Sequence, residues 1–414
     1  TFKPYDRVPP PYIHTLEEMF GDWLEKRYGS IEKAFATWDA EPGKVKGDDL
    51  EKGRVGLYFS GMLTANDWAV NQRNHARAED TARFLAKVEY DFFAMMKDYL
   101  QEDLGYGGPV CGSNMGTADH RVLQPLERWT NTACDFLDSH GYYGGARKQA
   151  DPPHFAMEVG DSYADRSVLR FDPKAPGQGG RLPAIPFLAP EWAGKPYTCS
   201  EFAWTRPNRF HGEMTVLAAV LGRTIGMDGM IHFALGVTPQ WSSRVNSYWP
   251  IQSPGVAGQW PATALIYRKG LVSEAGASVD ATLGLDKLFA LEGAPIVPPK
   301  AGDDLNEQMA PSGENTAVVG DRIDPRAFAI GKVAVDFAPG NQHKIESVDL
   351  SKYIDGEKKI MRPLNGEWKW DYNRGLLMLH TEQAQGVSGF VGNVDKVDLP
   401  VVSIESPMEY ASVL

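Results

Sequence analysis

The stretch "KPYTCSEFAWTRPN" (residues 195–208) places one carboxylate, Glu201, among aromatic, proline and amide residues. The composition of its first half predicts a short strand over 195–202. The segment that follows, 211–226, carries apolar residues at helical spacing and predicts a helix. Glu201 is therefore expected where a strand ends and before a helix begins.

The sequence on both sides of this stretch alternates in the same way. A strand followed by a helix and another strand predicts parallel pairing in βα units. The fold class expected for this part is therefore α/β. Strands are predicted at 109–115, 133–144 and 228–235, a short helix at "LQPLERWTN" (123–131), and a further helix at 261–272.

The first hundred residues are predicted to be mainly helical. Apolar residues recur at helical spacing over 16–38, and Gly29-Ser30 interrupts them, with Ser30 placed to cap a second helix. A long helix is predicted over 76–101, and "RVGLYF" (54–59) is interpreted as a short strand. The apolar face expected for the long helix comprises Leu85, Val88, Phe92, Met95 and Tyr99.

The composition changes after about residue 300. A polar, Gly- and Pro-containing stretch resembles a linker, and strand-like segments separated by turn residues follow it. This pattern predicts a small all-β sandwich at the C-terminus. The expected organisation is a (β/α)-barrel portion at 1–285, a linker at 286–324 and the sandwich at 325–414.

The bulk composition restricts the functional classes. A net charge of −12 over 414 residues argues against nucleic-acid or anionic-membrane binding. No apolar run approaches the ~20 residues of a membrane span. The three cysteines match no metal-binding spacing, and neither a His-Glu-x-x-His motif nor a phosphate-binding loop is present. No metal or cofactor is expected.

The loops that follow the predicted strands carry the candidate site. In a (β/α) barrel these loops hold the reacting groups. Here they contain a carboxylate, amides, an imidazole and aromatic rings, which suit the binding of a polyol. Each residue also has a plain structural alternative, such as a turn cap for an asparagine, packing for a tryptophan, or a salt bridge for Glu201. The candidates are Asn114, His140, Tyr142, Glu201, Trp204, Asn208 and Trp241.

Taken together, these segments resemble the second half of a clan A glycoside hydrolase barrel, over about residues 15–272. "GDWLEKRYGSIEKAFATW" (21–38) is similar to the helix after the fourth strand of that fold. "DFLDSHGYYG" (135–144) is similar to the sixth strand with its His-x-Tyr, and "YTCSEFAWTRPN" (197–208) to the seventh. The resemblance implies strands five to eight of a TIM (β/α)8 barrel followed by an accessory β-sandwich.

The same resemblance implies a retaining enzyme that hydrolyses β-linked oligo- or polysaccharides. Glu201 would be the nucleophile, and the other six candidates would bind substrate. Clan members usually carry a tryptophan just after strand eight, whereas Trp241 lies six residues beyond Leu235. A carbohydrate-degrading enzyme of this type is expected to be extracellular or periplasmic.

The second carboxyl group that such an enzyme needs has no counterpart here. In the clan it follows an asparagine just before the helix that begins near residue 15, but "TFKPYDRVPPPYIH" (1–14) contains no Asn-Glu pair. We therefore expect strands one to four, with the acid/base glutamate, on an N-terminal chain processed from the same precursor. In the alternative, "RVGLYF" and other segments complete an unusual fold.

A different class of function is also compatible with the sequence. The chain could be a non-catalytic surface or assembly protein built on a decayed glycosidase barrel, for which a missing acid is no obstacle. The sequence leaves the sugar, the linkage and the oligomeric state open.

Overall fold

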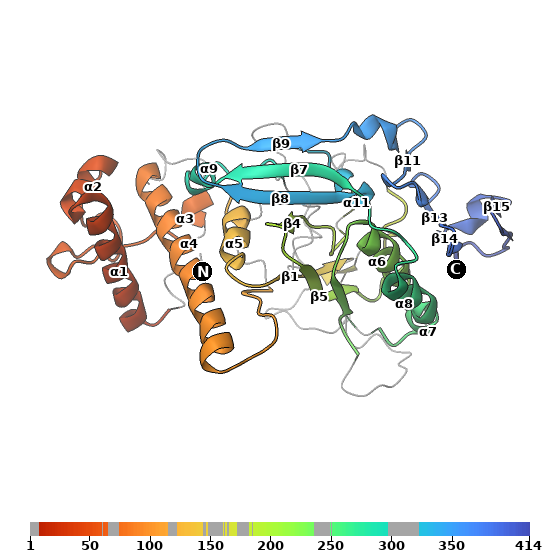
Figure 1. The fold of residues 1–414 in the computed structure, drawn as a ribbon, viewed down its shortest axis with the longest axis horizontal. Helices are drawn as coiled ribbons and strands as arrows, with labels where there is room; N and C mark the ends of the chain where they lie inside the picture. Colours follow the sequence, from red (N-terminus) through yellow and green to blue (C-terminus); the bar gives the residue numbers. More distant parts are fainter. Residues whose placement is uncertain are drawn as a thin grey trace.

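The computed structural model shows a mixed α/β protein. Helices of the first hundred residues lie at one end, parallel strands lie in the middle, and antiparallel strands of the C-terminal part lie at the other end (Figure 1). The structure describes residues 8–59, 61–64, 74–114, 122–143, 146–147, 160, 162–163, 165–171, 182–183, 185–235, 249, 251–296 and 323–414.

The N-terminal helices form as predicted. Helix α1 (Pro10–Tyr28) ends at Gly29, whose φ of 87° an L side chain rarely adopts. The Ser30 side chain accepts a hydrogen bond from the Lys33 N–H and so caps α2 (Ile31–Trp38). The segment 54–59, in contrast, forms no strand. It makes only a single bridge, between Asp49 and Arg54, after the short 3-10 helix η2 (Leu50–Lys52).

The long predicted helix is α4 (His75–Asp98), which follows α3 (Gly61–Thr64) and continues into a π-helical turn, η3 (Tyr99–Asp103). The Asn74 side chain caps α4 by accepting the Arg77 N–H. Only the first half of the predicted apolar face is buried. Leu85 lies in the core, whereas Phe92, Met95 and Tyr99 are exposed.

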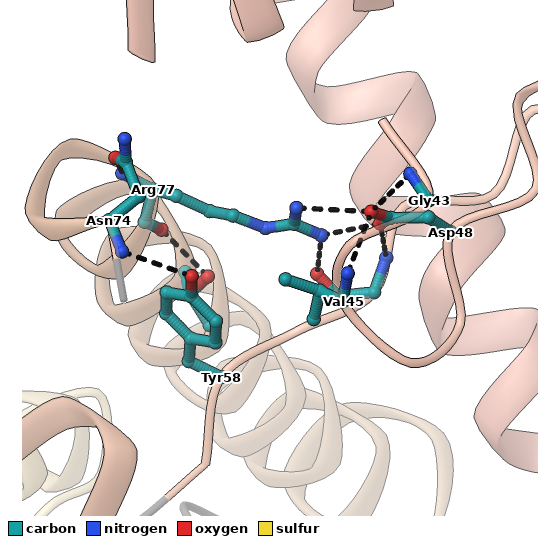
Figure 2. Close-up of polar contacts among 8 residues, drawn as sticks. Gly43, Val45, Asp48, Tyr58, Asn74 and Arg77 are labelled. Atoms are coloured by element: carbon teal, nitrogen blue, oxygen red, sulfur yellow. Dashed lines mark hydrogen bonds and ion pairs between the residues drawn. The ribbon is translucent and has the colours of Figure 1, made fainter. Parts of the chain in front are cut away.

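A buried ion pair connects α4 to the loop after α2 (Figure 2). The Arg77 guanidinium donates to both oxygens of Asp48 and to the Gly56 carbonyl. Backbone N–H groups of Gly43, Val45 and Gly56 also donate to Asp48. Both charged side chains are only 1% exposed. The rings of Phe35, Trp38 and Tyr58 lie 5.2–5.6 Å from the guanidinium carbon.

The central sheet is parallel, with strand order β1-β5-β6. Its strands are β1 (Leu137–Tyr143), β5 (Tyr197–Trp204) and β6 (Gly229–His232); β1 and β6 lie within predicted strands, and β5 extends two residues beyond the strand predicted at 195–202. The predicted helices also form, as α5 (Gln124–Asn131), α6 (Glu213–Thr224) and α8 (Trp260–Lys269), with the short α7 (Pro254–Ala257) before α8.

Of the strand predicted at 109–115, the described residues 109–114 form one parallel bridge, between Cys111 and Phe136. This bridge places the segment beside the start of β1, but the ladder does not continue along it. Among the described residues, the parallel strands form an open sheet and do not close into a barrel.

A second sheet was not anticipated as a unit. Its order is β4-β8-β7-β9, with β4, β8 and β7 parallel and β9 antiparallel. It crosses the domain boundary expected at 286–324, because β7 precedes that segment and β8 follows it. The elements are β4 (Glu191–Trp192), β7 (Ala277–Gly284), β8 (Lys332–Ala338) and β9 (Lys344–Ser347), with helices α9 (Leu285–Phe289) and α11 (Ala327–Ile330).

The rest of the C-terminal part is rich in strands, as the composition predicts. Its main sheet is six-stranded and antiparallel, and helix α6 packs against it. The Trp368 indole N–H donates to Thr224 of α6 at 2.9 Å. The main sheet consists of β10 (Ile354–Asp355), β11 (Ile360–Met361), β12 (Trp368–Asp371), β13 (Leu376–His380), β14 (Gln385–Gly389) and β17 (Ala411–Val413).

Smaller elements complete the described fold. Strands β15 and β16 pair with each other beside the six-stranded sheet. Strands β2 and β3, from the middle of the chain, form a separate antiparallel pair. Their bounds are β2 (Ala146–Arg147), β3 (Ser162–Tyr163), β15 (Val397–Asp398) and β16 (Ser403–Ile404), and the remaining 3-10 helices are η4 (Leu350–Lys352) and η5 (Val391–Asn393).

Candidate functional site

Three of the predicted site residues meet on the central sheet. Alternate residues of a strand point to the same face, so Asp138, His140 and Tyr142 of β1 share one face. Glu201 of β5 pairs with His140 in the parallel ladder. The imidazole, the phenol and the carboxylate therefore come from neighbouring strands.

A β-bulge in β5 brings Glu201 to that face. The register pairs Ser139 with Cys199 and then His140 with Glu201, so Ser200 is an extra residue. Without the bulge, Ser200 and Glu201 would point to opposite faces. With it, Ser200 contacts Asp138 while Glu201 contacts Tyr142. The bulge thus sets which side chains are in contact on this face.

Glu201 is held through one of its two oxygens. Oε2 accepts the Tyr142 hydroxyl and lies 3.3 Å from His140 Nδ1. Among the described residues, no hydrogen bond to Oε1 is found. The Glu201 side chain is 29% exposed, whereas that of His140 is 7% exposed. Among the described residues, the carboxylate is therefore held through Oε2 alone.

Aromatic rings form one wall beside this group. The Tyr142 ring lies 5.6 Å from that of Trp249 and 6.2 Å from that of Phe233, and these two rings are 5.5 Å apart. Packed rings restrict the Tyr142 rotamer, and so they fix the hydroxyl that donates to Glu201.

Trp204 does not join the group. Beyond the bulge, Trp204 alternates to the face opposite Glu201 and is buried. Its ring packs on Tyr143 and Phe187, at 5.4 and 6.4 Å between centroids. Its backbone N–H contacts the sulfur of Met214 on α6. Trp204 therefore fills the space between the sheet and the helix.

Asn208 is also committed to the fold. Its amide donates to the Arg166 carbonyl at 2.9 Å, and its side-chain oxygen accepts the Phe210 N–H. The turn-capping alternative accounts for the contact with Phe210, the bond to Arg166 ties the turn to a distant segment, and the residue is fully buried. Asn114 is exposed. Trp241 lies outside the described residues.

Two further residues, Ser200 and Asp138, contact this group and were not among the predicted site residues. Ser200 Oγ lies 3.0 Å from His140 Nε2 and donates to Asp138. Asp138 also accepts from the Thr198 hydroxyl at 2.5 Å and the Ser200 N–H at 3.0 Å. The alternation Asp138-x-His140-x-Tyr142 is a signal that could have indicated Asp138, but the bulge that brings in Ser200 is not visible in the sequence.

Glu213, the first residue of α6, is a second glutamate in this region and is fully buried. Ser167, the Val168 N–H and Tyr410 donate to its carboxyl group, the last two at 2.8 and 3.1 Å. Burial raises the pKa of Glu213 to about 7, although these hydrogen bonds act to lower it. Its location at the start of a helix, which the macrodipole favours, is thus accompanied by contacts with two other segments, 167–168 and Tyr410.

The described residues offer no cluster of His, Cys, Asp and Glu that could hold a metal ion. Cys111, Cys134 and Cys199 are free thiols, and burial raises the pKa of Cys111 and Cys134. Among the helices in the described ranges, none is both long enough and apolar enough to cross a membrane.

In comparisons with known proteins, no family model, curated protein or solved structure matches this chain.

Proposed function

We propose that this protein is a retaining glycoside hydrolase acting on β-linked oligo- or polysaccharides, with Glu201 as its nucleophile. The observation that carries the proposal is the geometry of the Glu201 carboxylate. One oxygen is held by Tyr142 and faces His140, and the other has no hydrogen bond from a described residue. A carboxylate on a rigid strand, oriented in this way, suits attack on an anomeric carbon.

The proposed reaction has two steps. Glu201 Oε1 attacks the anomeric carbon as the glycosidic bond breaks, and a carboxylic acid protonates the departing oxygen. Water, activated by the same group acting as a base, then releases the sugar. A retaining enzyme needs that second carboxyl group about 5–5.5 Å from the first. Asp138 does not suit this role, since it is buried and three donors already point at its oxygens.

The acid/base glutamate is accordingly proposed to lie on an N-terminal half of the barrel, supplied as a separate chain or fragment of the same precursor. On this proposal β1, β5 and β6 are barrel strands six to eight, and the segment bridging Phe136 is strand five. The parallel order β1-β5-β6 supports this alignment. The C-terminal strands would then be an accessory β domain, and the proposed location is extracellular or periplasmic.

Substrate binding is proposed for His140 and Tyr142, which contact Glu201, and for Asn114 and Trp241. No cofactor enters the proposed reaction.

The proposal is tested with Glu201→Gln in protein expressed from its complete gene. A carboxamide keeps the shape of the side chain but is a poor nucleophile. We expect hydrolysis of a β-glycoside to fall by ~10²–10⁴-fold or more, with sugar binding largely retained. A 2-fluoro sugar carrying a good leaving group should label Glu201, and mass spectrometry of the peptides locates the label.

Glu191→Gln is the matched control. Glu191 is also a half-buried strand glutamate, 26% exposed. It lies on the β4-β8-β7-β9 sheet, away from the sheet of Glu201, and forms an ion pair with Lys332 of β8. Its replacement should leave turnover unchanged. Labelling of another residue, or full turnover by Glu201→Gln, would reject Glu201 as the nucleophile. If the complete protein binds sugar but hydrolyses no glycoside, the non-catalytic surface or assembly protein becomes the better description.

A further inference from the structure

We propose that Asp138 and Ser200 are positioning residues that keep a proton on Nε2 of His140, so that one further proton is shared between His140 Nδ1 and Glu201. The chemical meaning of this arrangement rests on the proposed role of Glu201, but the protonation pattern itself does not. Four side chains contact one another in sequence, namely Asp138, Ser200, His140 and Glu201.

Asp138 is the buried carboxylate at one end of this path. Asp138 is 3% exposed, and its two oxygens receive the Thr198 hydroxyl, the Ser200 N–H and the Ser200 hydroxyl. The Arg128 guanidinium donates to the Asp138 backbone carbonyl at 2.9 Å. Three donors directed at two oxygens suit an ionised carboxyl group, which only accepts hydrogen bonds.

The second step is the direction of the serine proton. A hydroxyl group has one proton, and that of Ser200 is given to Asp138. The Ser200 oxygen can therefore only accept from His140 Nε2, which lies 3.0 Å away. Reversing this hydrogen bond would leave a buried carboxylate oxygen without its donor, which is costly. Nε2 of His140 consequently carries a proton.

The third step is the other ring nitrogen. Nδ1 of His140 faces Glu201 Oε2 at 3.3 Å. If neither group held a proton here, a nitrogen lone pair would face a carboxylate. A proton must therefore lie on Nδ1, which makes His140 an imidazolium, or on the Glu201 carboxyl group. With the proton on Nδ1, the charge of the imidazolium lies 3.3 Å from Oε2, the oxygen that also accepts the Tyr142 hydroxyl.

The polar groups facing the His140 ring in the described structure come from both strands. Ser200 and Glu201 of β5 contact the ring itself, and Asp138 and Tyr142 of β1 contact those two residues. Cys111 lies near Asp138, which acts to raise the pKa of that thiol. The path from Asp138 to Glu201 through Ser200 and His140 is thus the arrangement to be tested.

The test is ¹⁵N NMR of the histidine ring nitrogens at pH 7, without substrate, in protein expressed from its complete gene. The signals of His140 are assigned by their loss in His140→Asn. We expect Nε2 of the wild-type protein to show the shift of a protonated nitrogen. In Ser200→Ala the hydroxyl that accepts from Nε2 is removed. A single ring proton can then reside on Nδ1, beside Glu201. The Nε2 signal should then move to the value of an unprotonated nitrogen, and Asp138→Asn should produce the same change.

Thr198→Val is the matched control, since it removes another hydroxyl from Asp138 without touching the path to His140. It should keep the wild-type Nε2 shift. An unprotonated Nε2 in the wild-type protein, or an unchanged Nε2 in folded Ser200→Ala, overturns the proposal. Ser200→Ala decides the matter even if Asp138→Asn does not fold. Because no substrate is present, the result stands apart from any failure of Glu201 to act as a nucleophile.

Discussion

Single residues in this protein carry charges that the surrounding fold must compensate. The pair Arg77–Asp48 is the clearest example, since both side chains are 1% exposed and aromatic rings flank the guanidinium. Desolvation opposes the burial of such a pair, and the additional backbone donors on Asp48 offset part of that cost. Removal of one partner would leave an uncompensated charge in the core.

Asp48→Asn should therefore lower the free energy of unfolding by about 3–5 kcal/mol. Urea denaturation followed by circular dichroism measures this change. The control is Asp91→Asn, which breaks the exposed Lys87–Asp91 pair on α4. That change should stay within about 0.5 kcal/mol. Equal effects of the two substitutions would contradict the importance assigned to burial.

At the scale of elements, helix α6 connects two parts of the molecule through Glu213. Its carboxyl group receives donors from the loop residues Ser167 and Val168 and from Tyr410, next to β17. Burial is the largest influence on this group and raises its pKa to about 7, from an ordinary value of 4.5. Between pH 4.5 and pH 7, Glu213 therefore keeps its proton in the folded protein and loses it in the unfolded chain.

The sign of the pH effect follows from this difference. As the pH rises from about 4.5 to about 7, the contribution of Glu213 to the free energy of unfolding should fall by ~3 kcal/mol. Glu213→Gln does not titrate and should lack this component. Half-buried His211 and His232, whose pKa values are lowered by desolvation, produce the opposite slope in both proteins. The difference in melting temperature between wild type and Glu213→Gln, measured from pH 5 to pH 8, therefore isolates Glu213. A constant difference would disprove the assignment.

At the scale of the whole molecule, the described parts share one core. The sheet β4-β8-β7-β9 joins residues before and after the expected linker, and one cluster of buried residues extends from Ile13 to Leu379. Trp368 of the six-stranded sheet is buried in this cluster, and its indole N–H bonds to α6. These contacts favour cooperative unfolding over separate melting of a C-terminal domain.

Trp368→Ala should accordingly destabilise the whole protein in a single transition, by about 3–5 kcal/mol. Differential scanning calorimetry would show one peak shifted to lower temperature. Val401→Ala, at an exposed position, should leave the peak unchanged. Two separated peaks, with only one of them moved by Trp368→Ala, would instead support the division at 286–324.

The sequence by itself determined most of the local structure of the N-terminal and central regions. Helical spacing and the Gly29-Ser30 interruption located α1 and α2, because a left-handed glycine and a capping hydroxyl act on their immediate neighbours. Likewise, β1, β5 and α6 follow from short-range patterns. The same patterns put His140, Tyr142 and Glu201 in the loops that follow neighbouring strands, whereas the structure has all three within β1 and β5, side by side in the ladder.

Only the tertiary structure decided which side chains meet. The bulge at Ser200 reverses the face of Glu201, and beyond it Trp204 points toward α6 instead of the site. The exposed half of the α4 face, the single bridge formed by Cys111 and the pairing of β7 with β8 likewise depend on distant segments. Periodicity shows which residues of an element share a face, but it does not show what that face contacts, because contacts between distant segments depend on the packing of the whole chain.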